Sequence, residues 1–327
     1  MKICAYEVRE DERQEFETLA EKLQVEILYY EEVPCLENAH YAKECEGITI
    51  LGQGMIDREL LKCWKELGVQ YISTRTIGYN HIDMAAAKEL GIQVCNAAYP
   101  PSGVAEFTIM LMLMCLRNYK QALWRGQVND FSLRGLQGKE LGQLTVGVMG
   151  TGKIGAEVIR YLSGFGCRIL ANSAAENEDI KQYVTYVDLD TLYREADMIT
   201  LHIPLFTSTY HLINDDSIAK MKDGVIIINC ARGELIDTDS LIRGIESGKI
   251  GALGLDVVED EAGITHVDHR IDILCNQRMA YLRQFRNVVM TPHMAFYTDA
   301  AVHNMVLCGV QGIMEMKQTG TCDTCLI

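Results

Sequence analysis

The chain has 327 residues, which is more than one ordinary core holds and which fits two domains of about 150 residues each. Hydrophobic residues make up 48% and charged residues 23%, so the composition is that of a globular protein and excludes a disordered chain. The formal net charge of -15 argues against a nucleic-acid partner, because a phosphate backbone is bound by clustered lysine and arginine.

The first hundred residues alternate short strand-like runs with helical patterns. The predicted strands are 3–6, 47–51, 69–73 and 92–95. The predicted helices between them are 11–23, 58–67 and 83–90. This alternation is typical of a parallel sheet that is covered by helices on both faces.

The most apolar stretch of the chain, 107–116, follows Pro100 and Pro101. It is roughly half as long as a helix that spans a bilayer, so we expect no membrane segment. A helix this apolar is normally buried within or between subunits. We expect the helix over 102–118 to form the interface of a homodimer, and a core helix within one subunit is the alternative.

A second alternating unit begins at Leu144. Its predicted strands are 144–149, 167–171, 198–202, 225–229, 252–255 and 288–290, with a helix at 153–165. The last predicted helix, 298–317, has no strand after it and can return to the first unit. We therefore predict an α/β protein of two doubly wound, Rossmann-like parallel-sheet domains. The domain over 100–298 would be inserted in a domain made of 1–99 plus 299–327.

A glycine-rich motif, GxGxxG, lies directly after strand 144–149 and opens helix 153–165. The first glycine permits a tight turn, the second lets backbone approach a pyrophosphate, and the third lets the helix pack on the strand. The helix N-terminus adds unpaired N–H groups and a positive dipole end. Within a β-α-β unit this spacing predicts a dinucleotide site, and a purely structural turn is the alternative. The predicted binding residues are Gly150, Gly152, Lys153, Ile154 and Gly155.

The second strand of such a unit ordinarily ends in an acidic residue that binds the ribose 2′-hydroxyl of NAD. Here Ser173 stands in that position, and no arginine follows it to bind a 2′-phosphate. We therefore expect NAD as the cofactor, contacted by Ser173, with NADP possible.

Four motifs in one order resemble the D-2-hydroxyacid dehydrogenase family along the whole chain. They are the glycine-rich loop, Thr200-Leu201-His202-Ile203-Pro204-Leu205, Asn229-Cys230-Ala231-Arg232-Gly233 and Thr291-Pro292-His293. Within the family, 73–83 is similar to the D-lactate dehydrogenase of vancomycin-resistance operons. Segments 48–52 and 221–237 are similar to clostridial aryl-lactate and 2-hydroxyisocaproate dehydrogenases. The resemblance implies an NAD(P)-dependent oxidoreductase that interconverts 2-oxo acids and (R)-2-hydroxy acids.

Reduction of a 2-oxo acid requires a cation for the carboxylate, a proton for the developing alkoxide and a hydride donor held close. Arg232 follows a buried strand, so its guanidinium can emerge at the carboxyl end of the sheet. There it can bind a carboxylate in a bidentate manner, through two parallel hydrogen bonds. The resemblance implies that His293 is the general acid and that Glu261 holds its ring, which would raise the pKa of His293. Glu259 is only two residues from Glu261, so it is the competing carboxylate.

The resemblance also assigns residues that surround the two small molecules. Those expected at the substrate are Leu51, Gly52, Ile77, Gly78, Tyr99 and Phe296, with Gly52 leaving room for a side chain. Those expected at the cofactor are Ile203, Pro204, Thr209, Cys230, Ala231 and Asp256, with Asp256 accepting from the nicotinamide carboxamide. No metal is expected, because the pairs His266/His269 and Cys322/Cys325 are interpreted as surface and chain-end residues.

The predicted substrate is a 2-oxo acid with a bulky apolar or aromatic side chain, such as phenylpyruvate or 2-oxoisocaproate. One alternative is a D-lactate dehydrogenase that acts on pyruvate. The other is a dinucleotide-sensing binding protein of the corepressor type, which shares the family's motifs. The opening residues carry no secretory pattern, and the 12 cysteines lack disulfide-type spacing, so we expect a cytoplasmic location.

Overall fold

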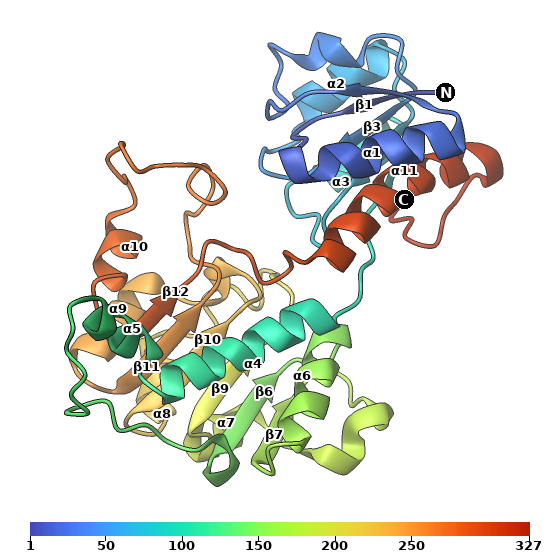
Figure 1. Ribbon diagram of the computed structural model, residues 1–327. Coiled ribbons are helices and arrows are strands. Elements are labelled where there is room, and N and C mark those ends of the chain that lie inside the picture. Colours follow the sequence, from blue (N-terminus) through green and yellow to red (C-terminus); the bar gives the residue numbers. More distant parts are fainter. The chain divides into compact units, whose positions relative to one another are not determined.

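The computed structural model describes residues 1–327 and divides the chain into two compact units (Figure 1). Unit 1 is Met1–Pro100 together with Tyr297–Ile327, and unit 2 is Pro101–Phe296. The chain thus leaves unit 1, builds unit 2 and returns, which confirms the predicted insertion of one α/β domain in another.

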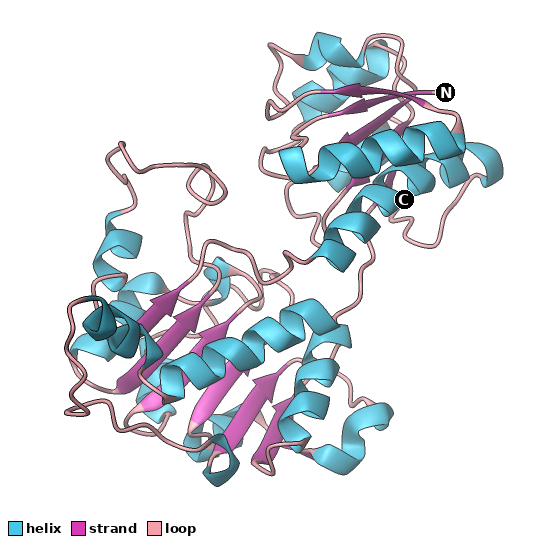
Figure 2. Ribbon diagram, in the orientation of Figure 1, coloured by secondary structure: helices cyan, strands magenta, loops and turns pink.

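Unit 1 is a five-stranded parallel sheet in the order β2-β1-β3-β4-β5. Its strands are β1 (Lys2–Ala5), β2 (Glu26–Tyr29), β3 (Gly47–Ile50), β4 (Tyr71–Thr74) and β5 (Gln93–Cys95). Its helices are α1 (Glu10–Leu23), the 3-10 helix η1 (Ala39–Ala42), α2 (Arg58–Glu66), α3 (Met84–Glu89) and α11 (Asp299–Thr319). Helices cover both faces of the sheet (Figure 2), because successive strand residues point to opposite sides and both sides are apolar.

The chain end of unit 1 is docked on the sheet. The N–H of Leu326 donates to Val94 O at 2.8 Å, and the N–H of Asn96 donates to Thr324 O at 3.2 Å. Cys322 and Cys325 are therefore half-buried beside β5. The two cysteines were interpreted as chain-end residues, and the structure adds that antiparallel pairing to the edge strand β5 satisfies the backbone of their segment.

Unit 2 is a seven-stranded parallel sheet in the order β12-β11-β10-β9-β6-β7-β8. Its strands are β6 (Thr145–Met149), β7 (Arg168–Asn172), β8 (Thr185–Tyr186), β9 (Met198–Leu201), β10 (Val225–Asn229), β11 (Ile250–Leu255) and β12 (Val288–Met290). Its α-helices are α4 (Ser102–Leu116), α5 (Tyr119–Gln127), α6 (Lys153–Ser163), α7 (Leu189–Glu195), α8 (Asp215–Lys220), α9 (Thr238–Glu246) and α10 (Gln277–Leu282). Its 3-10 helices are η2 (Leu141–Gln143), η3 (Glu178–Tyr183) and η4 (Gly233–Leu235).

Two apolar cores lie on the two faces of the unit 2 sheet. Helices α4 and α6 cover one face, and α7, α8 and α9 cover the other. The inner side of α4 packs in the core that it shares with α6. On its outer side, Met110 is 40% exposed and Leu113 is 36% exposed. No helix of the chain combines the length and the apolar character needed to cross a membrane.

Candidate active site

Three predicted catalytic residues follow three neighbouring strands of unit 2. Arg232 comes after β10, Glu261 after β11 and His293 after β12. These strands are adjacent and parallel in the sheet, so their carboxyl ends lie along one edge. Ligands of such sheets bind outside that edge, so the three side chains lie where a ligand of this sheet would bind.

The imidazole of His293 and the carboxylate of Glu261 form a close pair. Nδ1 of His293 lies 2.6 Å from Oε1 of Glu261, and Oε2 of Glu261 accepts the N–H of Val258 at 3.1 Å. Burial by itself lowers the pKa of His293, but the hydrogen bond to Glu261 and its charge outweigh burial, and Asp256 acts in the same direction. The nearby Arg232 opposes them, yet the pKa of His293 is raised overall, so the ring is kept protonated to higher pH.

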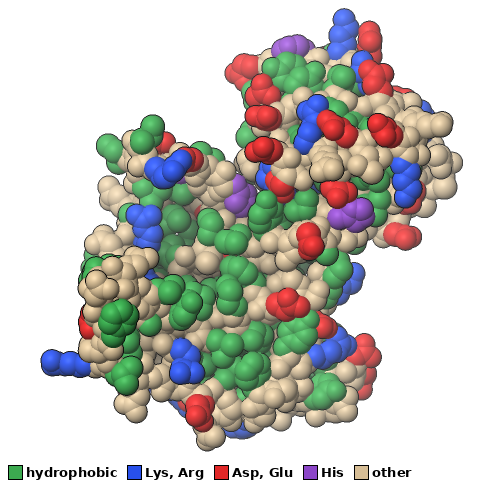
Figure 3. Space-filling view, viewed as in Figure 1, with side chains coloured by type: hydrophobic (Ala, Val, Ile, Leu, Met, Phe, Trp, Pro, Cys, Tyr) green, Lys and Arg blue, Asp and Glu red, His purple; other side chains and the backbone are tan.

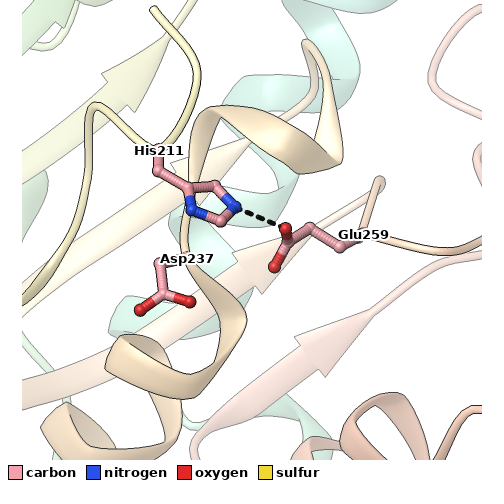
Figure 4. Close-up of side chains that lie close together, drawn as sticks. All are labelled: His211, Asp237 and Glu259. Carbon is pink, nitrogen blue, oxygen red and sulfur yellow. Dashed lines mark hydrogen bonds and ion pairs between the residues drawn. The ribbon is translucent and has the colours of Figure 1, made fainter.

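Glu259 points to a different partner, as Figure 4 shows. Its Oε1 lies 2.6 Å from Nε2 of His211, and its Oε2 accepts the N–H of Thr238 at 2.8 Å. Burial raises the pKa of Glu259, but hydrogen bonds from Thr238 and His211 outweigh it and hold this pKa below its usual value. Of the two acidic residues that the sequence offered, Glu261 contacts His293, whereas Glu259 anchors the start of α9.

The ligand atoms of His211, Asp237 and Glu259 lie within 4.8 Å of one another, a separation at which such atoms can hold a metal ion. Both oxygens of Glu259 already accept hydrogen bonds from the protein. The side chain of Asp237 caps α9 by accepting the N–H of Ser240 at 3.2 Å. These internal partners account for the cluster as a helix-capping network.

The turn that carries His293 is held by Asp256, which is 1% exposed. One carboxylate oxygen of Asp256 accepts from Thr291 Oγ1 at 2.6 Å and from the N–H of Met294 at 2.9 Å. The other accepts the N–H of Ala295 at 2.8 Å. His293 itself has a left-handed backbone with φ of 51°, a conformation that persists only where the surroundings fix it. Sequence reasoning missed this anchoring role; the expected contact of Asp256 with the nicotinamide stays a prediction.

Asn229 and Gly233 shape the segment that presents Arg232. The side chain of Asn229 donates to Arg232 O at 2.7 Å and accepts the N–H of Ala231 at 3.0 Å. A Cβ on Gly233 would lie 2.1 Å from the backbone carbon of Val258, so only glycine allows this close approach. The guanidinium of Arg232 is half-buried and donates to Ala231 O at 2.6 Å.

The glycine-rich loop has the geometry that a pyrophosphate needs. Gly150 has φ of +94°, and a Cβ on Gly155 would lie 2.0 Å from Gly150 O. A Cβ on Gly152 would meet no atom within 4 Å, so open space lies in front of this backbone. Helix α6, which begins at Lys153, has no side chain capping its first N–H groups. These residues fit a dinucleotide, whose phosphates Gly150 to Gly155 would hold at the helix N-terminus.

Other predicted cofactor residues lie near this loop. The hydroxyl of Ser173 accepts the N–H of Thr151 at 3.4 Å. Ile203 is close to Gly150, since a Cβ on Gly150 would lie 2.9 Å from Cγ2 of Ile203. The hydroxyl of Thr209 donates to Pro204 O at 2.8 Å and so closes the turn after β9.

Four of the predicted substrate residues of unit 1 follow β3 and β4: Leu51 and Gly52 come after β3, and Ile77 and Gly78 come after β4. Ile77 is 37% exposed, and its carbonyl accepts from Asn96 Nδ2 at 2.7 Å. Leu51 is buried, so its side chain is not on the surface. Gly52 has φ of +88°, and a Cβ on it would lie 2.7 Å from the ring of His81. The room that we expected beside Gly52 is therefore taken by His81.

The two aromatic residues expected to wall the substrate belong to different units. Tyr99 lies in unit 1 and is half-exposed. Phe296 is the last residue of unit 2, and its ring meets that of His293 edge-on at 6.3 Å. His266 is exposed, as expected of a surface residue, and its Nε2 lies 2.9 Å from His293 O, so it also contacts the turn that carries His293.

Comparison with known proteins identifies the family. Residues 109–295 match the family described as D-isomer specific 2-hydroxyacid dehydrogenase, NAD binding domain. The chain is 48% identical over 326 residues to an aromatic 2-oxoacid reductase of Clostridium sporogenes, covering 98% of each chain. It is 38% identical over 316 residues to a D-specific alpha-keto acid dehydrogenase of Enterococcus faecium, covering 97% of each. The apo structure of D-lactate dehydrogenase from Escherichia coli matches over 100% of both chains, with a TM-score of 0.89 at 35% identity.

The matched region contains the glycine-rich loop, Arg232, Glu261 and His293, and the full-length relatives extend the match over both units. The chain belongs to the D-isomer-specific 2-hydroxyacid dehydrogenases, which are NAD-dependent oxidoreductases.

Proposed function

We propose that the chain reduces 2-oxo acids to (R)-2-hydroxy acids with NADH as the hydride donor. The observation that carries this proposal is the 2.6 Å pair of His293 and Glu261, at the same sheet edge as Arg232. The bound nicotinamide would supply the hydride, and unit 2 would hold it through the loop from Gly150 to Gly155.

Each catalytic side chain has one task in this proposal. Arg232 binds the substrate carboxylate with its planar fork and polarises the adjacent carbonyl. The protonated ring of His293 donates a proton to the carbonyl oxygen as negative charge develops there. Glu261 fixes the orientation of that ring and stabilises its cationic form, so it acts through His293.

We further propose that the preferred substrates carry aromatic or bulky apolar side chains. Support comes from the aromatic 2-oxoacid reductase that is 48% identical and from the exposed Ile77 of unit 1. Gly52 gives no support to this preference, because the ring of His81 fills the space beside it.

Steady-state reduction of a panel of 2-oxo acids tests this preference. We expect a higher kcat/KM for phenylpyruvate and 2-oxoisocaproate than for pyruvate, since each buried methylene contributes about 0.8 kcal/mol. The oxidation of NADH is followed by absorbance for each acid under identical conditions. A higher kcat/KM for pyruvate than for phenylpyruvate would assign the chain to D-lactate formation instead.

Ser173 should permit the use of both cofactors, with NADH at least as good as NADPH. A serine repels no 2′-phosphate, but the turn supplies no free cation either: Lys181 is paired with Glu176 at 3.1 Å and Glu178 at 3.0 Å. Replacing Ser173 with aspartate should lower kcat/KM for NADPH selectively, by roughly 1–3 kcal/mol of binding in a partly solvated site.

The matched control for this prediction is Ser173→Asn, which has nearly the shape of aspartate without its charge. Its ratio of kcat/KM for the two cofactors should stay close to that of the wild type. If Ser173→Asp leaves the ratio where it was, or if the wild type accepts NADPH alone, another part of the chain discriminates between the cofactors.

A homodimer formed through 102–118 is part of the proposal. Figure 3 shows hydrophobic side chains gathered over α4. Exposed apolar residues continue into α5, where Leu123 is 51% and Trp124 is 65% exposed. Contiguous apolar surface of this kind marks protein interfaces, and only the outer side of α4 is available because its inner side is core. We also propose a reducing compartment, the cytoplasm, because all 12 cysteines are free thiols.

A further inference from the structure

A buried carboxylate holds the loop that follows β3 in unit 1. Glu7 is 3% exposed. Its Oε2 accepts the N–H of Leu51 at 2.5 Å and of Gly52 at 2.8 Å. Its Oε1 accepts the N–H of Gln53 at 2.8 Å and of Gly54 at 3.2 Å. Four successive backbone donors therefore converge on one side chain that lies more than forty residues away in sequence.

The position of Glu7 follows from the sheet. Strands β1 and β3 are adjacent and parallel, and their register pairs Ala5 with Thr49, which brings Glu7 level with Leu51. Glu7 has a left-handed backbone with φ of 55°, which is uncommon for a residue with a side chain. The carbonyl of Glu7 accepts a hydrogen bond from Nη2 of Arg75 at 3.0 Å, so Arg75 also stabilises this turn.

The guanidinium of Arg75 pairs with another carboxylate and not with that of Glu7. It is fully buried and forms an ion pair with Glu12, with Nε of Arg75 2.9 Å from Oε1 of Glu12. The negative charge of Glu7 consequently has only backbone amides around its oxygens in the described contacts. Converging backbone N–H groups form a concavity that binds anions, and here the chain's own carboxylate occupies it.

The anchored loop adjoins the residues that the proposed function gives to the substrate. Strands β3 and β4 are neighbours, and the N–H of Arg75 donates to Ile50 O at 2.7 Å. A Cβ on Gly52 would contact the ring of His81, which belongs to the segment that begins with Ile77 and Gly78. The carboxylate of Glu7 thus lies beneath a loop at the edge where the proposed function puts the substrate.

We propose that Glu7 is a specificity-determining residue that selects 2-oxo acids with uncharged side chains. It occupies the amides of residues 51–54 that would otherwise bind a second carboxylate, and its negative charge repels such a group. It also fixes the loop, so it is a positioning residue for the side chain of the substrate. The inference rests on the proposed function, because it requires the 2-oxo acid to meet this edge of unit 1.

The test compares discrimination between two substrates in the full-length enzyme. In Glu7→Gln, which removes the charge and keeps the shape, the ratio of kcat/KM for 2-oxoglutarate to kcat/KM for phenylpyruvate should rise by about tenfold or more. Glu7→Asp keeps the charge and should keep 2-oxoglutarate excluded. The control Glu10→Gln removes an equal charge from an exposed position nearby and should leave the ratio at the wild-type value.

A merely structural role predicts a different result. A loosened loop would lower kcat/KM for both substrates by the same factor and leave their ratio unchanged. A ratio that does not move in Glu7→Gln overturns the inference if phenylpyruvate is still reduced. A wild type that reduces no 2-oxo acid overturns the proposed function, and it thereby also overturns the selectivity assigned to Glu7.

Hydrogen exchange of the amides of residues 51–54 tests the anchoring without any catalysis. These amides should be protected in the wild type and in Glu10→Gln, and they should exchange faster in Glu7→Gln. The melting temperature, measured in parallel, identifies a variant that has lost its global fold. Equal protection in the wild type and in a folded Glu7→Gln protein would show that Glu7 does not hold the loop.

Discussion

Replacing Arg232 with lysine should lower kcat/KM for a 2-oxo acid by about 10- to 100-fold, although the positive charge is kept. A lysine ammonium is a point charge, whereas a carboxylate beside a carbonyl is bound by the two parallel donors of a guanidinium. Loss of one charged hydrogen bond costs roughly 1.5–3 kcal/mol, which sets the size of the effect. The measurement is kcat/KM for phenylpyruvate at saturating NADH.

The backbone around Arg232 should survive this change, because Asn229 and Gly233 fix the segment without the guanidinium. Arg243→Lys is the matched control: Arg243 lies on α9 of the same unit, and its side chain is 54% exposed and paired with Asp215. That variant should retain wild-type activity. Near-wild-type turnover of Arg232→Lys would remove Arg232 from the role of carboxylate ligand.

The parallel sheets were predictable because their strands are continuous apolar runs. Strand β10 was predicted with its exact bounds, since Val225–Asn229 is flanked by a glycine and by the motif that carries Arg232. Strand β2 was missed although its last three residues are apolar: it is an edge strand of only four residues that begins with the exposed Glu26, so its apolar run is short. The two-residue strand β8 at Thr185–Tyr186 is too short to leave a pattern.

The grouping of Arg232, Glu261 and His293 at one edge of the sheet was predictable for a related reason. In a parallel sheet the residues after each strand share one edge, so motifs at strand ends come together whatever lies between them. What the sequence could not give is the direction of each side chain. Glu259 and Glu261 differ by two positions, and only the fold turns the first to His211 and the second to His293.

In unit 1, the contacts of Gly52 and Glu7 likewise could not be predicted from the sequence. A glycine in a loop was interpreted as room for substrate, but its positive φ and the ring of His81 explain it without any ligand. The contacts of Glu7 join residues that are far apart in sequence, and no local pattern distinguishes a buried loop anchor from a surface glutamate. Tertiary contacts of polar side chains, rather than apolar periodicity, are the part that required the structure.

The reduction rate should fall as pH rises through the pKa of His293, because only the protonated ring can donate. Glu261 raises this pKa against the opposing effect of burial, so the fall should come above the usual pH range of a histidine. In Glu261→Gln a neutral amide stabilises the imidazolium less, so the pKa of His293 falls and the alkaline limb of the pH profile should move to lower pH. Profiles of kcat/KM against pH, recorded in the reduction direction, measure the shift.

Glu259→Gln is the control, since it removes the carboxylate of the other glutamate, two positions away. Glu259 accepts hydrogen bonds from Thr238 and His211, so this variant should lower the melting temperature and leave the alkaline limb in place. If the alkaline limb of the pH profile moves in Glu259→Gln and stays in Glu261→Gln, Glu259 is the carboxylate that stabilises the protonated ring of His293. A limb that moves in neither variant would mean that the titrating acid is not His293, because the carboxylate 2.6 Å from its ring must influence its protonation.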